Sequence, residues 1–164
     1  MRKKIVILLI LNLLLILFIH LFPSVNINAS GSIIYVDVNG GEEYTNIQDA
    51  IDDASNGDTI YVNSGVYYEN IFINKTINLF GNKKGISIIN GSMNKYTIYV
   101  STYNITIQNF TIKNSQVGII LKNSYNITIR GNTIQQTEIG INTENSSNNK
   151  IYLNDFKGNA ISAS

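Results

Sequence analysis

The sequence predicts an all-β protein that folds as a single-stranded right-handed parallel β-helix, a solenoid of about 22 residues per coil with a short amphipathic capping helix near its N-terminus. Three observations predict this fold. The C-terminal half repeats at an offset of 22 residues, and each repeat holds short runs in which apolar and polar residues alternate. The chain after residue 29 also contains 24 Ile and 22 Asn but no Cys, which suits short strands and tight turns held by core burial without disulfides.

Residues 1–29 are predicted to be a secretory signal peptide. Arg2, Lys3 and Lys4 precede a mainly apolar run at 5–22, and cleavage is expected after Ala29. An uncleaved signal anchor stays open as the alternative, because the apolar run approaches the length that spans a bilayer. In both cases residues 30–164 form the β-helix domain, which is expected to be secreted or exposed at the cell surface. Any membrane contact would involve only the N-terminal segment.

An amphipathic helix is expected from about residue 46 to 55. Thr45 and Gln48 have the spacing of a capping box, and Asn56-Gly57 supplies a left-handed stop. The apolar residues Ile47, Ala50, Ile51 and Ala54 share one face, whereas Asp49, Asp52 and Asp53 lie on the other. We expect this helix to cover an exposed end of the solenoid, where strand edges would otherwise be unpaired.

The coils after the helix are irregular at first and regular later. Strands separated by unequal loops are expected at 59–62, 70–73, 76–79, 86–89 and 97–100. From residue 59 onward we expect about four to five coils, given about 22 residues in each.

The regular part begins at Tyr103, where the segment 103–107 recurs as 125–129. Three short strands are expected in each period, because three alternating runs are separated by Asn, Ser and Gly clusters. The aligned columns are Ile107, Ile129 and Ile151; Ile112, Ile134 and Phe156; Asn104, Asn126 and Asn148; Asn132 and Asn154; Gly118 and Gly140. Stacked Ile side chains should fill the interior, and aligned Asn side chains should form hydrogen-bonded ladders.

The C-terminal residues 161–164 stop inside a coil. A solenoid terminus normally carries a polar capping unit, so the domain is expected to be incomplete at this end. An open rung of this kind also predicts end-to-end self-association.

A resemblance to a known family is carried by three segments, residues 44–54, 57–62 and 64–71. Their order and spacing resemble the opening of pectin lyase-like right-handed β-helix proteins. The chain most resembles the surface and periplasmic β-helix family related to the copper-insertion protein of nitrous oxide reductase maturation, over residues 33–161. The resemblance implies an exported β-helix that binds or cleaves polysaccharide, or serves as a surface adhesin.

The residues themselves offer little for metal or acid–base chemistry. The chain after residue 29 has no Cys, no His and only Met93 among the Met residues, so the ligands that copper prefers are missing. No cofactor is expected, and Ca²⁺ is left open without support, because the helix acids are expected to be solvated surface charges. Glu144 and Asp155 are the one candidate pair for glycoside hydrolysis, but no catalytic residue is assigned.

The candidate binding residues are Tyr103, Tyr125 and Arg130. The two tyrosines share a column, so their rings could form a stripe on which sugar faces stack, and Arg130 is expected to point outward, where it could bind a uronate. The expected function is therefore non-catalytic carbohydrate binding or adhesion, with a polysaccharide or cell-surface glycan as partner. The alternatives are a polysaccharide lyase or glycoside hydrolase and, below that, a copper-insertion-type β-helix protein.

Two further patterns bear on partners. Without residues 1–29 the chain has nine Lys and Arg against eleven Asp and Glu, a net charge of −2 with no block of one sign, which argues against nucleic acid. Asn-x-Ser/Thr acceptor patterns for glycosylation occur at Asn28, Asn74, Asn90, Asn104, Asn109, Asn126 and Asn145.

Overall fold

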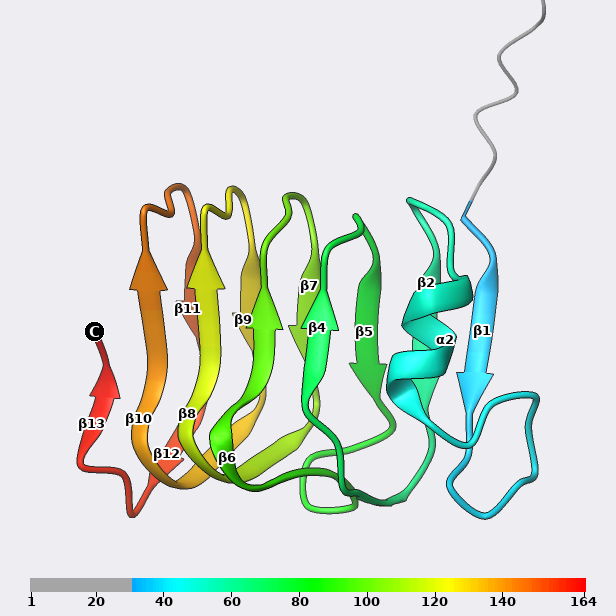
Figure 1. Ribbon diagram of the computed structural model, residues 1–164, viewed down its shortest axis with the longest axis horizontal. Helices are drawn as coiled ribbons and strands as arrows, with labels where there is room; N and C mark the ends of the chain where they lie inside the picture. Colours follow the sequence, from blue (N-terminus) through cyan, green and yellow to red (C-terminus); the bar gives the residue numbers. More distant parts are fainter. Residues whose placement is uncertain (1–30) are drawn as a thin grey trace, which may run out of the picture.

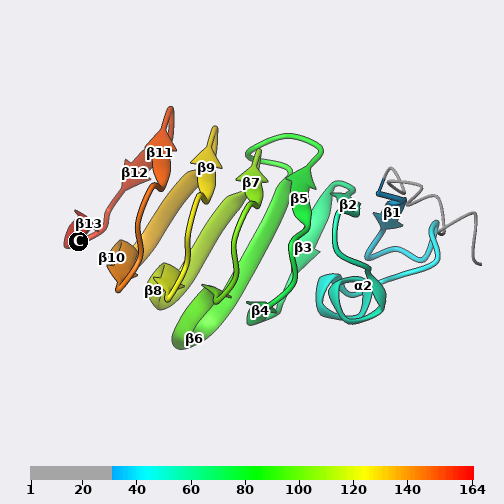
Figure 2. The ribbon, with the colours of Figure 1, turned by 90° about the horizontal axis from the view of Figure 1, so that it is seen from above.

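The computed structural model describes residues 31–164, so the predicted signal peptide lies outside the described residues. Two parallel sheets face each other across a single core (Figures 1 and 2). The back sheet has the order β1 (Ile33–Val36), β2 (Thr59–Val62), β5 (Asn78–Gly81), β7 (Thr106–Gln108), β9 (Thr128–Arg130), β11 (Lys150–Tyr152). The front sheet comprises β3 (Gly65–Tyr67), β4 (Ile71–Ile73), β6 (Ser87–Val100), β8 (Thr111–Lys122), β10 (Thr133–Glu144), β12 (Asp155–Lys157) and β13 (Ile161–Ala163). The predicted parallel β-helix is confirmed.

The strand register follows the predicted repeat. Ile107 pairs with Ile129, and Ile129 with Ile151, so that each strand of the back sheet meets its equivalent 22 residues later. The first coils are irregular, as expected. Ile60 pairs with Leu79, and Leu79 with Ile107, at offsets of 19 and 28 residues.

The three short strands expected in each period are replaced by two. The second and third runs are continuous in β6, β8 and β10, each of which bends without leaving the sheet. The bend in β8 lies at Asn114 (φ 59°) and the bend in β10 at Gln136 (φ 56°), both in the left-handed region. Asn adopts this conformation more readily than most residues, which suits it to the bend.

The core consists of stacked aliphatic side chains between the sheets. Ile107, Ile129, Ile112 and Ile134 are all fully buried, and each such side chain stabilises the fold by roughly 1.5–3 kcal/mol. Gly118 permits the close stacking of consecutive coils, since a Cβ built there would lie 2.5 Å from the Gly140 carbonyl oxygen.

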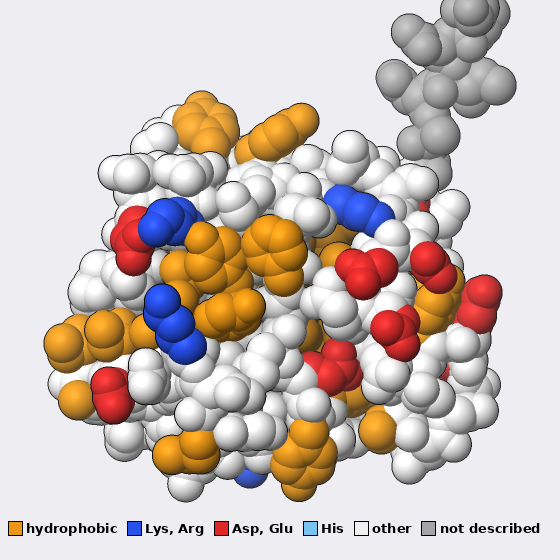
Figure 3. All heavy atoms as spheres, viewed as in Figure 1, with side chains coloured by type: hydrophobic (Ala, Val, Ile, Leu, Met, Phe, Trp, Pro, Cys, Tyr) orange, Lys and Arg blue, Asp and Glu red, His pale blue; other side chains and the backbone are white. Residues whose placement is uncertain are grey.

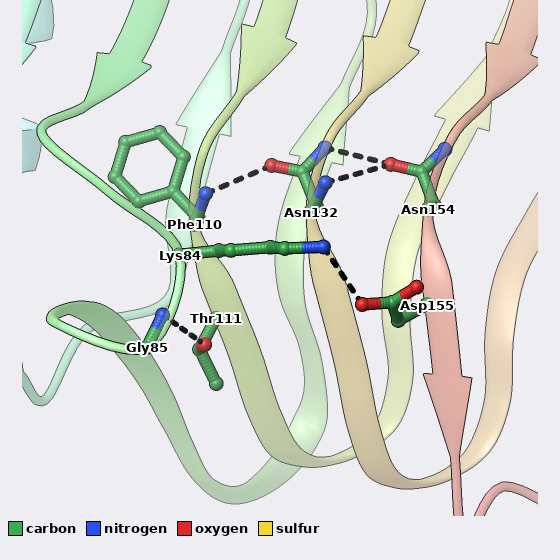
Figure 4. A network of polar contacts seen from close by, with 7 residues as sticks. All are labelled: Lys84, Gly85, Phe110, Thr111, Asn132, Asn154 and Asp155. Atoms are coloured by element: carbon green, nitrogen blue, oxygen red, sulfur yellow. Dashed lines mark hydrogen bonds and ion pairs between the residues drawn. The ribbon is translucent and has the colours of Figure 1, made fainter.

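The predicted Asn ladder runs inside the coil bend (Figure 4). Asn132 Oδ1 accepts a hydrogen bond from the Phe110 backbone N–H at 3.0 Å, and Asn154 Oδ1 accepts one from the Asn132 N–H at 3.0 Å. Asn132 Nδ2 donates both to Asn154 Oδ1 and to the Ile107 carbonyl, each at 3.1 Å. These buried amides therefore satisfy backbone groups that the turn leaves without a strand partner.

Helix α2 (Ile47–Asp53) is shorter than the range predicted, and both of its predicted end signals are wrong. The N-cap is Asn46, which makes no side-chain capping bond. The carboxylate of Glu69 accepts hydrogen bonds from the Ile47 and Gln48 N–H groups instead, both at 2.9 Å. At the other end Ala54 is extended (ψ 148°), so the left-handed Gly57 belongs to the following turn.

The helix caps the edge of the front sheet at β4, where a further strand would otherwise pair (Figures 1 and 2). Gln48 Oε1 accepts a hydrogen bond from the Phe72 N–H at 2.8 Å, and Gln48 Nε2 donates to the Phe72 carbonyl at 3.3 Å. One side-chain amide thus takes the place of a neighbouring backbone, and the expected capping helix is confirmed. Within residues 31–164 no helix has the length and apolarity needed to cross a membrane.

Candidate functional site

The outer face of the back sheet carries one continuous column of large side chains, which we call the back ladder. Strand register places its members opposite one another on successive strands. They are Tyr35, Tyr61, Phe80, Gln108, Arg130 and Tyr152. Consecutive rungs of a parallel sheet lie ~4.8 Å apart, so the ladder runs along the solenoid axis.

The N-terminal half of the back ladder is aromatic. The rings of Tyr35 and Tyr61 are stacked, with centroids 5.8 Å apart and planes at 24°. Phe80 meets Tyr61 edge-on at 5.5 Å. Tyr35 is 45% exposed and Tyr61 37% exposed, so their apolar faces are open to a ligand.

A groove of about 280 Å³ lies along this part of the ladder. Its lining includes Tyr35, Tyr61, Phe80 and Gln108, together with Asn82 and Asn109. The Gln108 Oε1 atom is buried and has no hydrogen-bond partner among the described residues. An unpaired buried acceptor costs about 1–3 kcal/mol, and a ligand hydroxyl or amide donor would remove that cost.

Arg130 lies on the next rung, exposed on the outer face as predicted. Within the part of the chain that the structure describes, ion pairs join Lys84 to Asp155 and Lys122 to Glu144, and neither includes Arg130. The guanidinium therefore offers charged hydrogen-bond donors next to Gln108 and Tyr152.

Tyr103 and Tyr125 lie apart from the back ladder, at the corner where the chain passes from the front sheet to the back sheet. They bridge each other in register, and they are 55% and 50% exposed. The Tyr125 hydroxyl accepts a hydrogen bond from Asn148 Nδ2 at 2.7 Å. The structure thus stacks the two predicted tyrosines but does not bring them together with Arg130, which follows Tyr125 by five residues of chain.

The front sheet carries a second aromatic depression, which we call the front groove, of about 410 Å³ and lined by Phe72, Tyr96, Tyr99 and Ser101. The Tyr99 ring contacts Phe72 at 5.6 Å and Tyr96 at 5.4 Å. Figure 3 shows these side chains as part of an apolar patch over β4, β6 and β8, with basic side chains beside it. Val117, Ile139 and Ile161 extend the column of Tyr96 toward the C-terminus.

The candidate catalytic pair is not assembled. Asp155 lies opposite Thr133 at the start of β10, whereas Glu144 ends that strand. Each carboxylate is held in its own ion pair at 2.8 Å, which lowers the pKa of Asp155 through Lys84 and the pKa of Glu144 through Lys122. Neither is therefore a suitable proton donor at neutral pH, and their separation exceeds the roughly 5–9.5 Å that glycoside hydrolysis requires.

Most of the aromatic positions were not singled out from the sequence. The alternation in Tyr35 and Tyr61 could have placed both rings outward on predicted strands. Phe80 and Gln108 were hidden by the irregular loops of the first coils, since their register is not a multiple of the repeat. The burial of Gln108 Oε1 depends on neighbouring strands and has no signal in the sequence.

Residues 25–164 match the protein family described as "Periplasmic copper-binding protein (NosD)". The chain belongs to the NosD family. A "Cell surface glycoprotein" of Methanothermus fervidus is 40% identical over 90 residues, and the match covers 53% of this chain and 15% of that relative. The chain thus spans only a small part of the length of this relative.

Solved structures of pectin methylesterases have a similar fold. The enzyme from carrot superposes with a TM-score of 0.57 at 17% identity, covering 69% of this chain and 46% of the enzyme. A pectin methylesterase in complex with a hexasaccharide gives a TM-score of 0.54 at 14% identity, covering 67% and 48%. At these identities the likeness shows the fold alone, and it supports the recognised pectin lyase-like β-helix.

The residues described here do not fit the copper ion in the description of the NosD family. Residues 31–164 contain no Cys or His, and the Met93 side chain is 77% exposed at a bend. No group of three or more His, Cys, Asp or Glu residues lies close enough to hold a metal ion within this range. Copper requires soft or imidazole ligands, so no step of a function is derived through it.

Proposed function

We propose that this NosD-family protein is an exported surface β-helix that binds carbohydrate without cleaving it, with the back ladder as the binding surface. The family description and the name of the Methanothermus relative both refer to proteins outside the cytoplasm, which supports the location. The single observation that carries the binding role is the stacked Tyr35–Tyr61–Phe80 series, which continues in register into Gln108 and Arg130.

The back ladder matches the chemistry of a sugar chain. Pyranose rings present apolar faces that pack on aromatic rings, and their hydroxyls need hydrogen-bond partners. The aromatic half supplies the first, and Gln108 Oε1 and Arg130 supply the second. Because the rungs run along the axis, a linear chain lying along the back sheet would contact several of them together.

The binding test compares the wild type with the double variant Tyr61→Ala/Phe80→Ala. Each aromatic contact contributes about 0.5–1.5 kcal/mol beyond area burial, so loss of two should weaken binding roughly tenfold or more. A glycan array identifies the ligand, and titration calorimetry then measures the affinity. The matched control is Tyr68→Ala, which removes a 71% exposed ring outside the ladder.

Unchanged affinity in the Tyr61→Ala/Phe80→Ala variant would sink the proposal. The corner residues are tested in the same assay with Tyr103→Ala/Tyr125→Ala, and loss of binding in this variant alone would move the site to the corner. Reproducible release of reducing ends from pectin, alginate or glucans, abolished by Arg130→Ala, would instead favour the lyase or hydrolase alternative.

A further inference from the structure

The exposed glycosylation acceptor patterns gather on one corner of the solenoid. Four connections pass from the front sheet to the back sheet, joining β4 to β5, β6 to β7, β8 to β9 and β10 to β11 (Figure 1). Each connection holds one Asn-x-Ser/Thr pattern with an exposed Asn: Asn74, Asn104, Asn126 and Asn145. We call this corner the sequon ridge.

The remaining patterns in residues 31–164 lie elsewhere and are less accessible. Asn90 is 8% exposed, and its Oδ1 accepts a hydrogen bond from the Ser92 N–H at 3.0 Å. Asn109 is half-buried between β7 and β8 and lines the groove of the back ladder. A glycan on Asn90 could not be accommodated in the folded coil, because its amide is packed inside it.

We propose that the sequon ridge is a site of N-linked glycosylation, so that attached glycans cover this corner and leave both sheet faces free. In the reaction, the Asn Nδ2 forms a bond to the anomeric carbon of an oligosaccharide carried on a lipid phosphate. The bond from that carbon to the phosphate oxygen breaks, the lipid phosphate leaves, and one Nδ2 proton is lost to a base of the host transferase. The required donor is therefore a lipid-linked oligosaccharide.

The ridge positions are not equivalent. Asn126 Nδ2 donates a hydrogen bond to Asn104 Oδ1 at 2.8 Å, so the reactive nitrogen of Asn126 is occupied while that of Asn104 points away from the pair. The two residues are on adjacent coils, ~4.8 Å apart, which leaves room for one branched glycan rather than two. Occupancy at Asn104 should therefore exceed occupancy at Asn126.

The ridge also gives the corner tyrosines a role within the molecule. Tyr103 directly precedes Asn104, and its exposed ring lies in register with that of Tyr125. A sugar attached to Asn104 would lie beside these rings and could pack on them. Tyr103 and Tyr125 would then contact the protein's own glycan.

The test is expression of the full chain in a eukaryotic secretory host, with site occupancy measured by glycopeptide mass spectrometry. Occupancy is expected at Asn74, Asn104 and Asn145 and is expected to be absent at Asn90 and Asn109. The substitutions Thr76→Ala, Thr106→Ala and Ser147→Ala each remove one acceptor pattern without changing the Asn, and each should remove one glycan mass. The matched controls Thr76→Ser, Thr106→Ser and Ser147→Thr keep the pattern and should keep the glycan.

Two results would overturn the proposal. One is occupancy at Asn90 or Asn109 in the folded, secreted protein at a level equal to that of the ridge. The other is an unmodified ridge in a host that glycosylates a co-expressed control protein. Because the back ladder is a separate surface, the carbohydrate-binding test can succeed or fail independently of this one.

Discussion

Asn132 illustrates how single side chains hold the coil bends together. It is fully buried, and its amide satisfies the Phe110 N–H on one side and the Ile107 carbonyl on the other. Asn154 repeats this role one coil later, donating to the Ile129 carbonyl at 2.8 Å. Each amide thus replaces backbone pairing where the chain turns, and the columns transmit the register from one coil to the next.

At the residue scale, Asn132→Ala should lower the free energy of unfolding by about 2–4 kcal/mol, since it leaves two or three buried polar groups unpaired at about 1–3 kcal/mol each. Urea denaturation followed by circular dichroism measures the change. Asn74→Ala, at an exposed position, is the control and should stay within about 0.5 kcal/mol of the wild type. A loss below about 1 kcal/mol for Asn132→Ala would show that water or a local shift replaces the ladder.

Helix α2 shows how an element can depend on a distant residue. Its first N–H groups are held by Glu69, 22 residues from Ile47 along the chain, and Gln48 joins it to the front sheet. Burial raises the pKa of the Glu69 carboxyl, and the hydrogen bonds from Ile47 and Gln48 oppose this only in part. The local sequence favoured a Thr45 cap because a capping box contains no information about residues that arrive from the next coil.

At the element scale, Glu69→Ala should destabilise the protein by about 1–3 kcal/mol at acidic pH, since it removes the partners of two helix N–H groups. The pKa of Glu69 is raised above its ordinary value of 4.5, so the folded state holds the proton more tightly than the unfolded state. Its contribution to stability is therefore fully present below pH 4.5 and falls as the pH rises through the folded pKa.

The measurement is the free energy of unfolding of the wild type and of Glu69→Ala at several pH values from 4 to 7. The gap between the two should narrow as the pH rises. Glu42→Ala is the control for removal of an exposed carboxylate. A gap that widens with pH would mean that the two N–H donors outweigh burial and that the pKa of Glu69 is lowered.

For the whole molecule, the repeat explains why so much of the fold could be predicted. The columns of Ile107, Ile112 and Asn132 recur at a fixed offset, and stacking is the one way in which such short units bury an apolar face. The back ladder could be predicted only in part. Arg130 lies inside the regular repeat, whereas Phe80 enters the ladder through a coil of different length, which only the folded register reveals.

The last coil leads to a prediction about assembly. Ile151 is 36%, Leu153 77% and Ile161 48% exposed, and the outer edges of β11, β12 and β13 have no strand partner in the described chain. Unpaired edges with apolar side chains favour pairing with another chain. Sedimentation velocity should therefore show reversible association that increases with concentration, and Ile161→Lys should reduce it. A wild type that stays monomeric at all concentrations would contradict this.

The most direct test of the central claim, an exported β-helix that binds sugar along its back ladder, is a side-chain NMR titration of the labelled protein with the oligosaccharide that the array selects. The account predicts shift changes at the rings of Tyr61 and Phe80 and at the side-chain amide of Gln108, with the front groove unaffected. Changes confined to Phe72, Tyr96 and Tyr99, with a silent back ladder, would contradict it.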